Sequence, residues 1–237
     1  MSRILLEIVA CTVGDCVAAE SGGADRIELC AAISTGGLTP SLGTLVEAKK
    51  RVKIPVMAMV RPRAGGFCYS DEDFAVMRRD AALMVEHGAD GIVFGMLHAG
   101  GSVDTRRCGK IVEIAGDRQT VFHRAFDVVA DPLRAIDELV DLGFTRVLTS
   151  GRNKTAYEGR LLIERLIRRA AGRIEVLPGG GVRAHNVLEL VEETGCTQVH
   201  MTAFPRRPDA SSLSCEQVDR QIVRQVRQRL YEIGNSQ

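Results

Sequence analysis

The stretch Glu20-Ser21-Gly22-Gly23-Ala24-Asp25-Arg26-Ile27-Glu28 carries the chain from the end of a predicted helix, through glycine, into a predicted strand. Glycine is the expected residue there, because it adopts the left-handed conformation at a helix end without steric cost. The same junction returns at three later points: His87-Gly88-Ala89-Asp90-Gly91-Ile92, Leu142-Gly143-Phe144-Thr145-Arg146-Val147 and Thr194-Gly195-Cys196-Thr197-Gln198-Val199. A junction that recurs in this way predicts an architecture of repeated βαβ modules.

Short β-rich runs alternate with amphipathic helical stretches along the chain. The predicted strands are residues 4–10, 25–30, 54–60, 91–95, 120–126, 146–150, 174–178 and 198–204. The predicted helices are residues 12–22, 41–52, 71–87, 104–116, 131–142, 155–171, 183–194 and 215–233. Eight βα units without a linker predict an α/β fold, a single (β/α)₈ TIM-barrel domain over residues 1–237. The last helix would close the barrel or contribute to an oligomer contact. An open doubly wound sheet is the alternative, but no GxGxxG motif follows the first strand.

The composition argues against several classes of function. The chain has 31 basic and 30 acidic residues, a net charge of +1 and no Trp. This balance gives no electrostatic field that would attract nucleic acid or an anionic membrane. Aromatic side chains on which bases could stack are also scarce. The seven cysteines are an odd, dispersed set without a CxxC pair, and no signal-peptide pattern precedes the first strand. Both features predict reduced thiols in the cytoplasm.

Ionisable side chains interrupt strands that otherwise read as fully buried. They are Glu7, Glu28, Arg61, His123 and His200. An isolated charge in an apolar strand costs several kcal/mol unless it finds partners or faces a wet cavity. In a (β/α)₈ barrel, the carboxyl ends of the strands and the loops that follow them form the site. These five residues therefore predict a shared polar site in the barrel.

This cluster has two chemical interpretations and one structural alternative. Glu7, Glu28, His123 and His200 could supply a general acid and base for catalysis. The same two carboxylates and two imidazoles could instead hold a divalent metal ion. The structural alternative is a self-satisfied network that keeps the barrel uniquely folded. No Lys lies within a predicted strand, which disfavours a Schiff-base aldolase.

Candidates for binding an anion lie around the same mouth. Arg61 and Arg124 could hold a carboxylate or phosphate in forked geometry, the alternative being structural ion pairs with Glu28 or Asp127. The seventh strand leads into a glycine run, where backbone N–H groups can approach an anion. The remaining candidates are the glycines of this run and polar positions at the rim: Gly179, Gly180, Gly181, Asp127, Ser150 and Thr202.

Strand parity places two thiols together. Because side chains alternate along a strand, Cys11 shares a face with Glu7, and Cys30 shares a face with Glu28. If both glutamates face the lumen, both cysteines point to the same side of neighbouring strands, which lie about 4.8 Å apart. Two sulfur ligands suit Cu(I). The alternative is that both cysteines pack as small hydrophobic residues.

These motifs resemble the CutC copper-homeostasis family along about residues 3–204. The matching segments are Gly23–Cys30, Gly36–Ser41, Arg61–Arg63, Phe122–Asp127, Val147–Gly151 and Pro178–Gly181. The resemblance implies a (β/α)₈ barrel and a cytoplasmic protein that is commonly a homo-oligomer, for which we expect a dimer. It also implies a role in copper tolerance or trafficking, with Cu(I) bound by cysteines. The pair that matches this role is Cys11 and Cys30.

Two hypotheses follow. In the first, the protein binds Cu(I) through the two thiols. In the second, it is a barrel enzyme, an isomerase, epimerase or lyase that acts on a phosphorylated or carboxylated metabolite through the Glu/His/Arg pocket. The expected partner is a metal ion or a small anionic metabolite, without nucleic acid, membrane or nucleotide cofactor. The sequence leaves open whether the protein is an enzyme.

Overall fold

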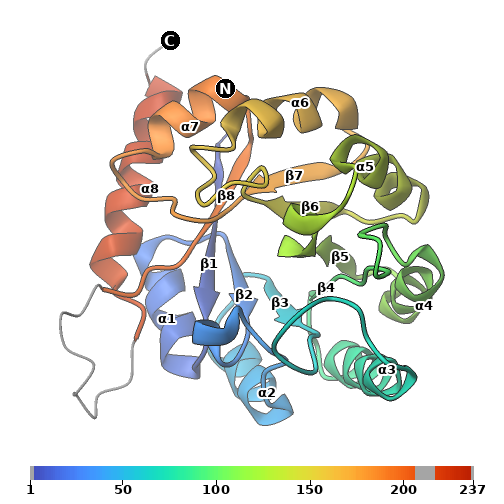
Figure 1. Ribbon diagram of the computed structural model, residues 1–237. Coiled ribbons are helices and arrows are strands. Elements are labelled where there is room, and N and C mark those ends of the chain that lie inside the picture. Colours follow the sequence, from blue (N-terminus) through green and yellow to red (C-terminus); the bar gives the residue numbers. More distant parts are fainter. Residues whose placement is uncertain (1–2, 206–216, 236–237) are drawn as a thin grey trace.

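Eight parallel strands form a sheet that curves into a nearly closed barrel (Figure 1). The computed structural model describes residues 3–205 and 217–235. The strands are β1 (Leu5–Ala10), β2 (Arg26–Leu29), β3 (Val56–Met59), β4 (Gly91–Phe94), β5 (Gln119–Phe122), β6 (Arg146–Thr149), β7 (Glu175–Pro178) and β8 (Gln198–Met201). Their order is β7-β6-β5-β4-β3-β2-β1-β8, and a parallel bridge between Gly179 and His200 joins the two edges. The predicted (β/α)₈ barrel is confirmed.

The helices surround the barrel on its outside (Figure 1). They are α1 (Val13–Gly22), α2 (Leu42–Arg51), α3 (Asp71–Glu86), α4 (Thr105–Ala115), α5 (Pro132–Asp141), α6 (Arg160–Ala170), α7 (Val187–Thr194) and α8 (Arg220–Asn235). Two short 3-10 helices, η1 (Ile33–Thr35) and η2 (Arg124–Val128), follow β2 and β5. Both therefore lie at the end of the barrel where the strands terminate.

The ends of the helices explain why the sequence folds into this register. All four predicted junction glycines take a positive φ, from 69° at Gly195 to 98° at Gly23, as their helix-to-strand role requires. Helices α1 and α3 begin with capping boxes, in which Thr12 and Ser70 each accept a hydrogen bond from a backbone N–H three residues later. Local sequence thus fixes where these elements start and stop.

Several boundaries differ from the sequence prediction. Strand β5 ends at Phe122 and not at residue 126, because His123 caps the 3-10 helix η2. Strand β8 ends at Met201, three residues early, and helices α6 and α7 begin five and four residues late, since turns precede both helices. Helix α8 begins at Arg220, and residues 215 and 216 of the predicted helix lie outside the described residues.

The barrel interior is partly apolar and partly polar. One apolar cluster fills the space between strands and helices, and a smaller one lies inside the lumen. The lumen cluster consists of Val9, Cys30, Met57, Met59, Val93, Val121, Leu148 and Leu177. Within residues 3–205 and 217–235, no helix is both long and apolar enough to cross a membrane.

Candidate functional site

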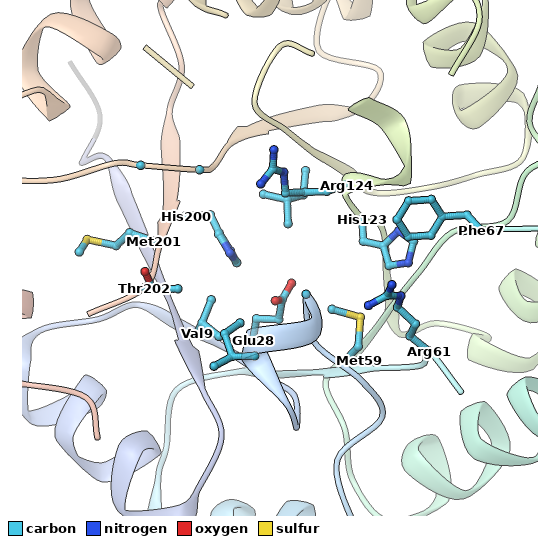
Figure 2. Close-up of a pocket in the computed structure, with 15 residues that line it drawn as sticks. Val9, Glu28, Met59, Arg61, Phe67, His123, Arg124, His200, Met201 and Thr202 are labelled. Atoms are coloured by element: carbon cyan, nitrogen blue, oxygen red, sulfur yellow. The ribbon is translucent and has the colours of Figure 1, made fainter. Parts of the chain in front are cut away.

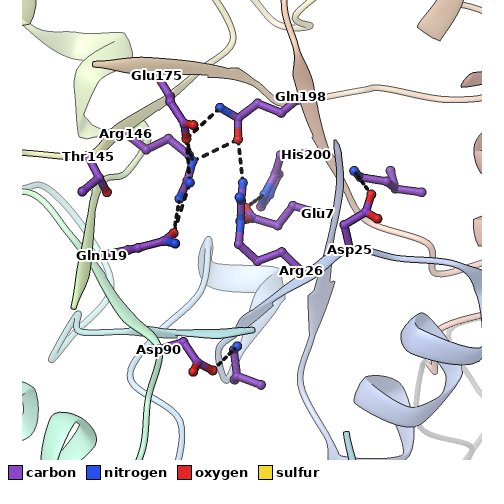
Figure 3. Close-up of polar contacts among 12 residues, drawn as sticks. Glu7, Asp25, Arg26, Asp90, Gln119, Thr145, Arg146, Glu175, Gln198 and His200 are labelled. Atoms are coloured by element: carbon purple, nitrogen blue, oxygen red, sulfur yellow. Dashed lines mark hydrogen bonds and ion pairs between the residues drawn. The ribbon is translucent and has the colours of Figure 1, made fainter. Parts of the chain in front are cut away.

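A buried polar network fills the barrel near the amino ends of the strands (Figure 3). Arg26 donates through Nε to Glu7 and through Nη2 to Oε1 of Gln198, the latter at 2.7 Å. The same oxygen of Gln198 accepts a hydrogen bond from Nε of Arg146 at 3.0 Å. Arg146 in turn contacts the carboxylate of Glu175 at 2.6 Å. Two guanidiniums and two carboxylates balance one another in this network, and Glu7 is its member among the five predicted strand residues.

Glu7 connects this network to the barrel mouth. Its second oxygen, Oε1, accepts a hydrogen bond from Nδ1 of His200 at 2.7 Å. Burial would raise the pKa of Glu7, but Arg26 and His200 outweigh it and hold that pKa well below its usual range. Burial would lower the pKa of His200, but Glu28 and Glu7 raise it above its ordinary value. Glu7 is therefore an ionised carboxylate that orients the imidazole of His200.

One oxygen of the Glu28 carboxyl group lacks a hydrogen-bond partner in the described structure. The residue is buried, and its Oε2 receives no hydrogen bond from any described residue. Burial raises the pKa of Glu28 to about 7, against a lowering effect of His200. Glu28 can therefore hold or release a proton near neutral pH, which is the property of a general acid or base.

Three of the four predicted metal ligands lie together. Ligand atoms of Glu7, Glu28 and His200 all lie within 4.8 Å of one another, and all three residues are buried. Both oxygens of Glu7 are already engaged, by Arg26 and by His200. Among the described residues, this leaves Glu28 and the second ring nitrogen of His200 for a divalent ion, with the positive charge of Arg26 nearby. This donor set fits a hydrogen-bonded ligand better than a divalent cation such as zinc, which usually takes three or four protein ligands.

His123 lies across the cavity from His200 (Figure 2). The backbone N–H of Ala125 donates to its Nδ1 at 3.2 Å, so the neutral ring carries its proton on Nε2. This Nε2 is buried and has no partner within the described part of the chain. Burial and the charge of Arg61 lower the pKa of His123 to about 3. His123 therefore presents a neutral, unused N–H donor.

The lowered pKa of His123 predicts a pH dependence of stability. Below the ordinary pKa of 6.5, His123 binds a proton in the unfolded chain, whereas in the folded protein it stays neutral down to about pH 3. Between pH 6.5 and 5, we expect the free energy of unfolding to fall by about 1.5 kcal/mol more in the wild type than in His123→Gln. The titration of Glu28 in this range changes the stability with the opposite sign. Its contribution cancels in the comparison, because both proteins contain Glu28. Parallel profiles in chemical denaturation would contradict the prediction.

Arg61 lines the cavity, and its guanidinium also forms hydrogen bonds that hold the surrounding loops. Nη1 donates to the backbone oxygens of Thr35 and Gly37, at 3.0 and 2.9 Å, and Nη2 donates to the oxygen of Gly65 at 2.8 Å. Arg61 is 5% exposed, and its Nε has no partner among residues 3–205 and 217–235. Its hydrogen bonds go to neutral carbonyl groups and not to Glu28. A positive charge is therefore held in the cavity wall without a directly bonded carboxylate.

Arg124 and Asp127 form the ion pair that was the alternative to anion binding. Nε of Arg124 donates to Oδ2 of Asp127 at 2.7 Å, and Nη2 donates to Oγ of Ser150 at 2.8 Å. Asp127 also accepts hydrogen bonds from the hydroxyl of Thr149, at 2.5 Å, and from the backbone N–H of Ser150, at 3.0 Å. These contacts fix Arg124 across the ends of β5 and β6. Its side chain is still 46% exposed, so one edge of the guanidinium remains accessible.

Glycines keep the mouth open next to Arg124. A Cβ at Gly179 would lie 2.6 Å from Leu148 and 3.0 Å from His200, so no side chain fits there. A Cβ at Gly180 would lie 3.3 Å from Ser150 and 3.5 Å from Nη1 of Arg124. Gly180 also has a φ of 105°, which L residues rarely adopt. Glycine here preserves the free space beside the Arg124 guanidinium.

These groups surround one cavity of about 360 Å³ at the barrel mouth (Figure 2). The predicted site residues in its wall are Glu28, Arg61, His123, Arg124, Gly180, Gly181, His200 and Thr202. The predicted residues that do not line it are Glu7, Cys11, Cys30, Asp127, Ser150 and Gly179. Glu7, Asp127 and Ser150 bond to residues in the wall, and so position the lining rather than form it.

Sequence reasoning missed two groups of residues. Arg26 and Arg146 are charged residues inside strands, the same signal that singled out Glu7, yet they were not included. The apolar residues of the cavity wall could not be identified from the sequence, because they look the same as residues of the hydrophobic core. This part includes Val9, Ile33, Met59, Phe67, Leu148 and Met201.

Cys11 and Cys30 converge, as strand parity predicted. Their Sγ atoms lie 3.9 Å apart. Cys30 is buried, whereas Cys11 is partly exposed. A hydrogen bond from Cys30 lowers the pKa of Cys11, and this bond together with burial raises the pKa of Cys30. Cys11 is therefore the thiol that ionises first.

Comparison with known proteins gives consistent results for sequence and structure. The sequence model of the CutC family matches residues 4–204. The chain is 52% identical to a family protein CutC of Treponema denticola over 90% of this chain and 86% of that protein. It is 44% identical to the copper homeostasis protein cutC homolog of Homo sapiens, over 92% of this chain and 84% of that protein. A crystal structure of a copper homeostasis protein CutC from Streptococcus agalactiae superimposes with a TM-score of 0.80 at 36% identity, covering 84% of this chain and 98% of that one.

Proposed function

This chain belongs to the CutC family, and from that premise we propose that it is a cytoplasmic copper-homeostasis protein that binds Cu(I) through Cys11 and Cys30. The names of the relatives supply the link to copper, and the residues of this chain supply the ligands. Thiolates are soft donors that select Cu(I) over the hard cations that carboxylates prefer. The Glu/His cluster therefore takes no part in this proposal.

The single observation that carries the proposal is the 3.9 Å separation of the two sulfurs. With metal–thiolate bonds of about 2.3 Å, one ion can contact two sulfurs that are up to about 4.6 Å apart. Partial exposure of Cys11 gives an ion a route to the pair, while burial of Cys30 shields the pair from solvent. Cys11 also has a lowered pKa, and ionised thiolates are the form that binds metals.

An anaerobic Cu(I) titration against a chromophoric chelator tests the proposal. We expect the wild type to bind one Cu(I) tightly, and the Cys11→Ser, Cys30→Ser double variant to bind it at least about 100-fold more weakly. Serine keeps the size of each side chain and removes the soft donor. Thermal melts of the metal-free proteins would show whether the double variant is folded.

Cys68→Ser is the matched control, because Cys68 is exposed and does not take part in the Cys11–Cys30 contact. Its Cu(I) affinity should equal that of the wild type. Affinity that survives in the double variant, or falls equally in the control, would overturn the proposal.

A further inference from the structure

The mouth cavity contains polar groups that the protein itself leaves unused. Oε2 of Glu28, Nε2 of His123 and Nε of Arg61 are all buried, and none has a hydrogen-bond partner in the described structure. All three residues line the cavity and are at most 5% exposed. Leaving a buried donor or acceptor unsatisfied costs about 1–3 kcal/mol. Such groups around a single cavity indicate a bound ligand that satisfies them.

The charge of the cavity wall indicates the nature of that ligand. Arg61 contributes a buried positive charge whose terminal nitrogens bond to the neutral carbonyl oxygens of Thr35, Gly37 and Gly65. Arg124 adds a second guanidinium, held in place by Asp127 and Ser150, with its Nη1 next to the space that glycine leaves at position 180. Two guanidiniums at one cavity are suited to an oxyanion, because their N–H groups match carboxylate and phosphate oxygens.

We propose that this cavity binds a small metabolite that carries one oxyanion group, phosphate or carboxylate, together with hydroxyl or carbonyl oxygens. The oxyanion faces Arg124 and Arg61, and the neutral oxygens of the ligand bond to His123, Glu28 and His200. A volume of about 360 Å³ lies within the range of small-molecule sites and leaves room for a short phosphorylated or carboxylated polyol.

This site is distinct from the thiol pair of the proposed function. Neither Cys11 nor Cys30 lines the cavity. Gly37 lies next to both Cys30 and Met59: a Cβ at Gly37 would be 3.5 Å from Sγ of Cys30 and 3.5 Å from Cε of Met59, and of these residues Met59 lines the cavity. Loss of both thiols should leave binding in the cavity intact.

Isothermal titration of metal-free, reduced protein at constant ionic strength tests the proposal. The probes are glycerol 3-phosphate, glycerate and uncharged glycerol. We expect saturable binding of one or both anions below about 10 mM and none of glycerol. Binding of the phosphate or of the carboxylate alone would identify the oxyanion. No saturable binding of either anion, or equal binding of glycerol, would overturn the proposal.

Variants assign the binding to this cavity. Arg124→Gln should weaken anion binding at least about tenfold, since it removes the guanidinium and leaves Asp127 as a negative charge. His123→Phe keeps a ring but removes both the N–H donor and the acceptor that caps η2, and should also weaken binding. Arg134→Gln is the control, because Arg134 is an exposed residue of α5 that pairs with Glu138 on the surface. Equal affinities in Arg124→Gln, His123→Phe and Arg134→Gln would place the binding elsewhere. The Cys11→Ser, Cys30→Ser protein should bind the anion like the wild type, so failure of the copper proposal and failure of this one are distinguishable.

Discussion

Glu7→Gln is expected to lower the free energy of unfolding by about 3–5 kcal/mol, as measured by chemical denaturation at pH 7. Glu7 is 2% exposed and is bonded to both Arg26 and His200. Glutamine keeps the shape of the side chain but removes its charge. The network would then hold two guanidiniums, of Arg26 and Arg146, against the single carboxylate of Glu175. An uncompensated buried charge accounts for the large loss.

Glu175→Gln is the matched control for this prediction. Glu175 belongs to the same network, but its side chain is 50% exposed, so water can solvate Arg146 in its place. We expect a loss of about 1 kcal/mol or less. Replacing Glu7 and Arg26 together by methionine should cost much less than Glu7→Gln, because the remaining charges balance. A Glu7→Gln protein as stable as Glu175→Gln would show that Glu7 does not compensate a buried charge.

The fold could be predicted from the sequence because its signals are local. A glycine such as Gly23 marks the end of a helix, whatever the rest of the chain does, since the left-handed conformation is required there. Four such junctions and alternating strands and helices then leave few topologies open. Boundaries were harder to predict, because β5 gives way to the 3-10 helix η2 at His123, whose side chain accepts a capping hydrogen bond that the apolar pattern does not reveal.

The residues of the site could be predicted in part, but their pairing could not. Charge inside a strand identifies Glu7 and Glu28 equally, yet the structure gives them opposite roles. Both oxygens of Glu7 are bonded, to Arg26 and His200, whereas Oε2 of Glu28 has no hydrogen-bond partner among the described residues. Which of two buried carboxylates is satisfied depends on contacts between distant strands, such as β1 with β8, and sequence spacing carries no such information.

Strand parity correctly predicted that the two thiols converge, because their contact is between neighbouring strands. Cys11 and Cys30 follow neighbouring strands, β1 and β2, whose register pairs Val9 with Glu28 and Ala10 with Leu29. Two side chains just beyond those pairs must meet if both strands continue in the same direction. Arg61 shows the limit of this argument, because its partners are backbone carbonyls of two loops whose paths the strand pattern does not predict.

The contact between the loop after β6 and the start of α6 supports the next prediction. Gly159 precedes α6, and a Cβ at this position would lie 2.0 Å from the carbonyl oxygen of Ser150 and 2.8 Å from Cα of Gly151. The φ of Gly159 is −88°, a value that alanine adopts without strain. The substitution therefore tests only the steric clash of the added Cβ. The displaced atoms are backbone, which cannot move aside as a flexible side chain can.

Gly159→Ala is therefore expected to lower the free energy of unfolding by about 3 kcal/mol or more, with a matching fall in melting temperature. Because Ser150 accepts a hydrogen bond from Arg124, its displacement should also weaken anion binding in the mouth cavity. Gly100→Ala is the control: it too lies in a loop without a left-handed φ, and nothing lies within 4 Å of its added Cβ. Its cost should stay within about 0.5 kcal/mol. Equal stability of the two variants would mean that the backbone of residues 150 and 151 does not press against Gly159, and that Arg124 owes its position to other contacts.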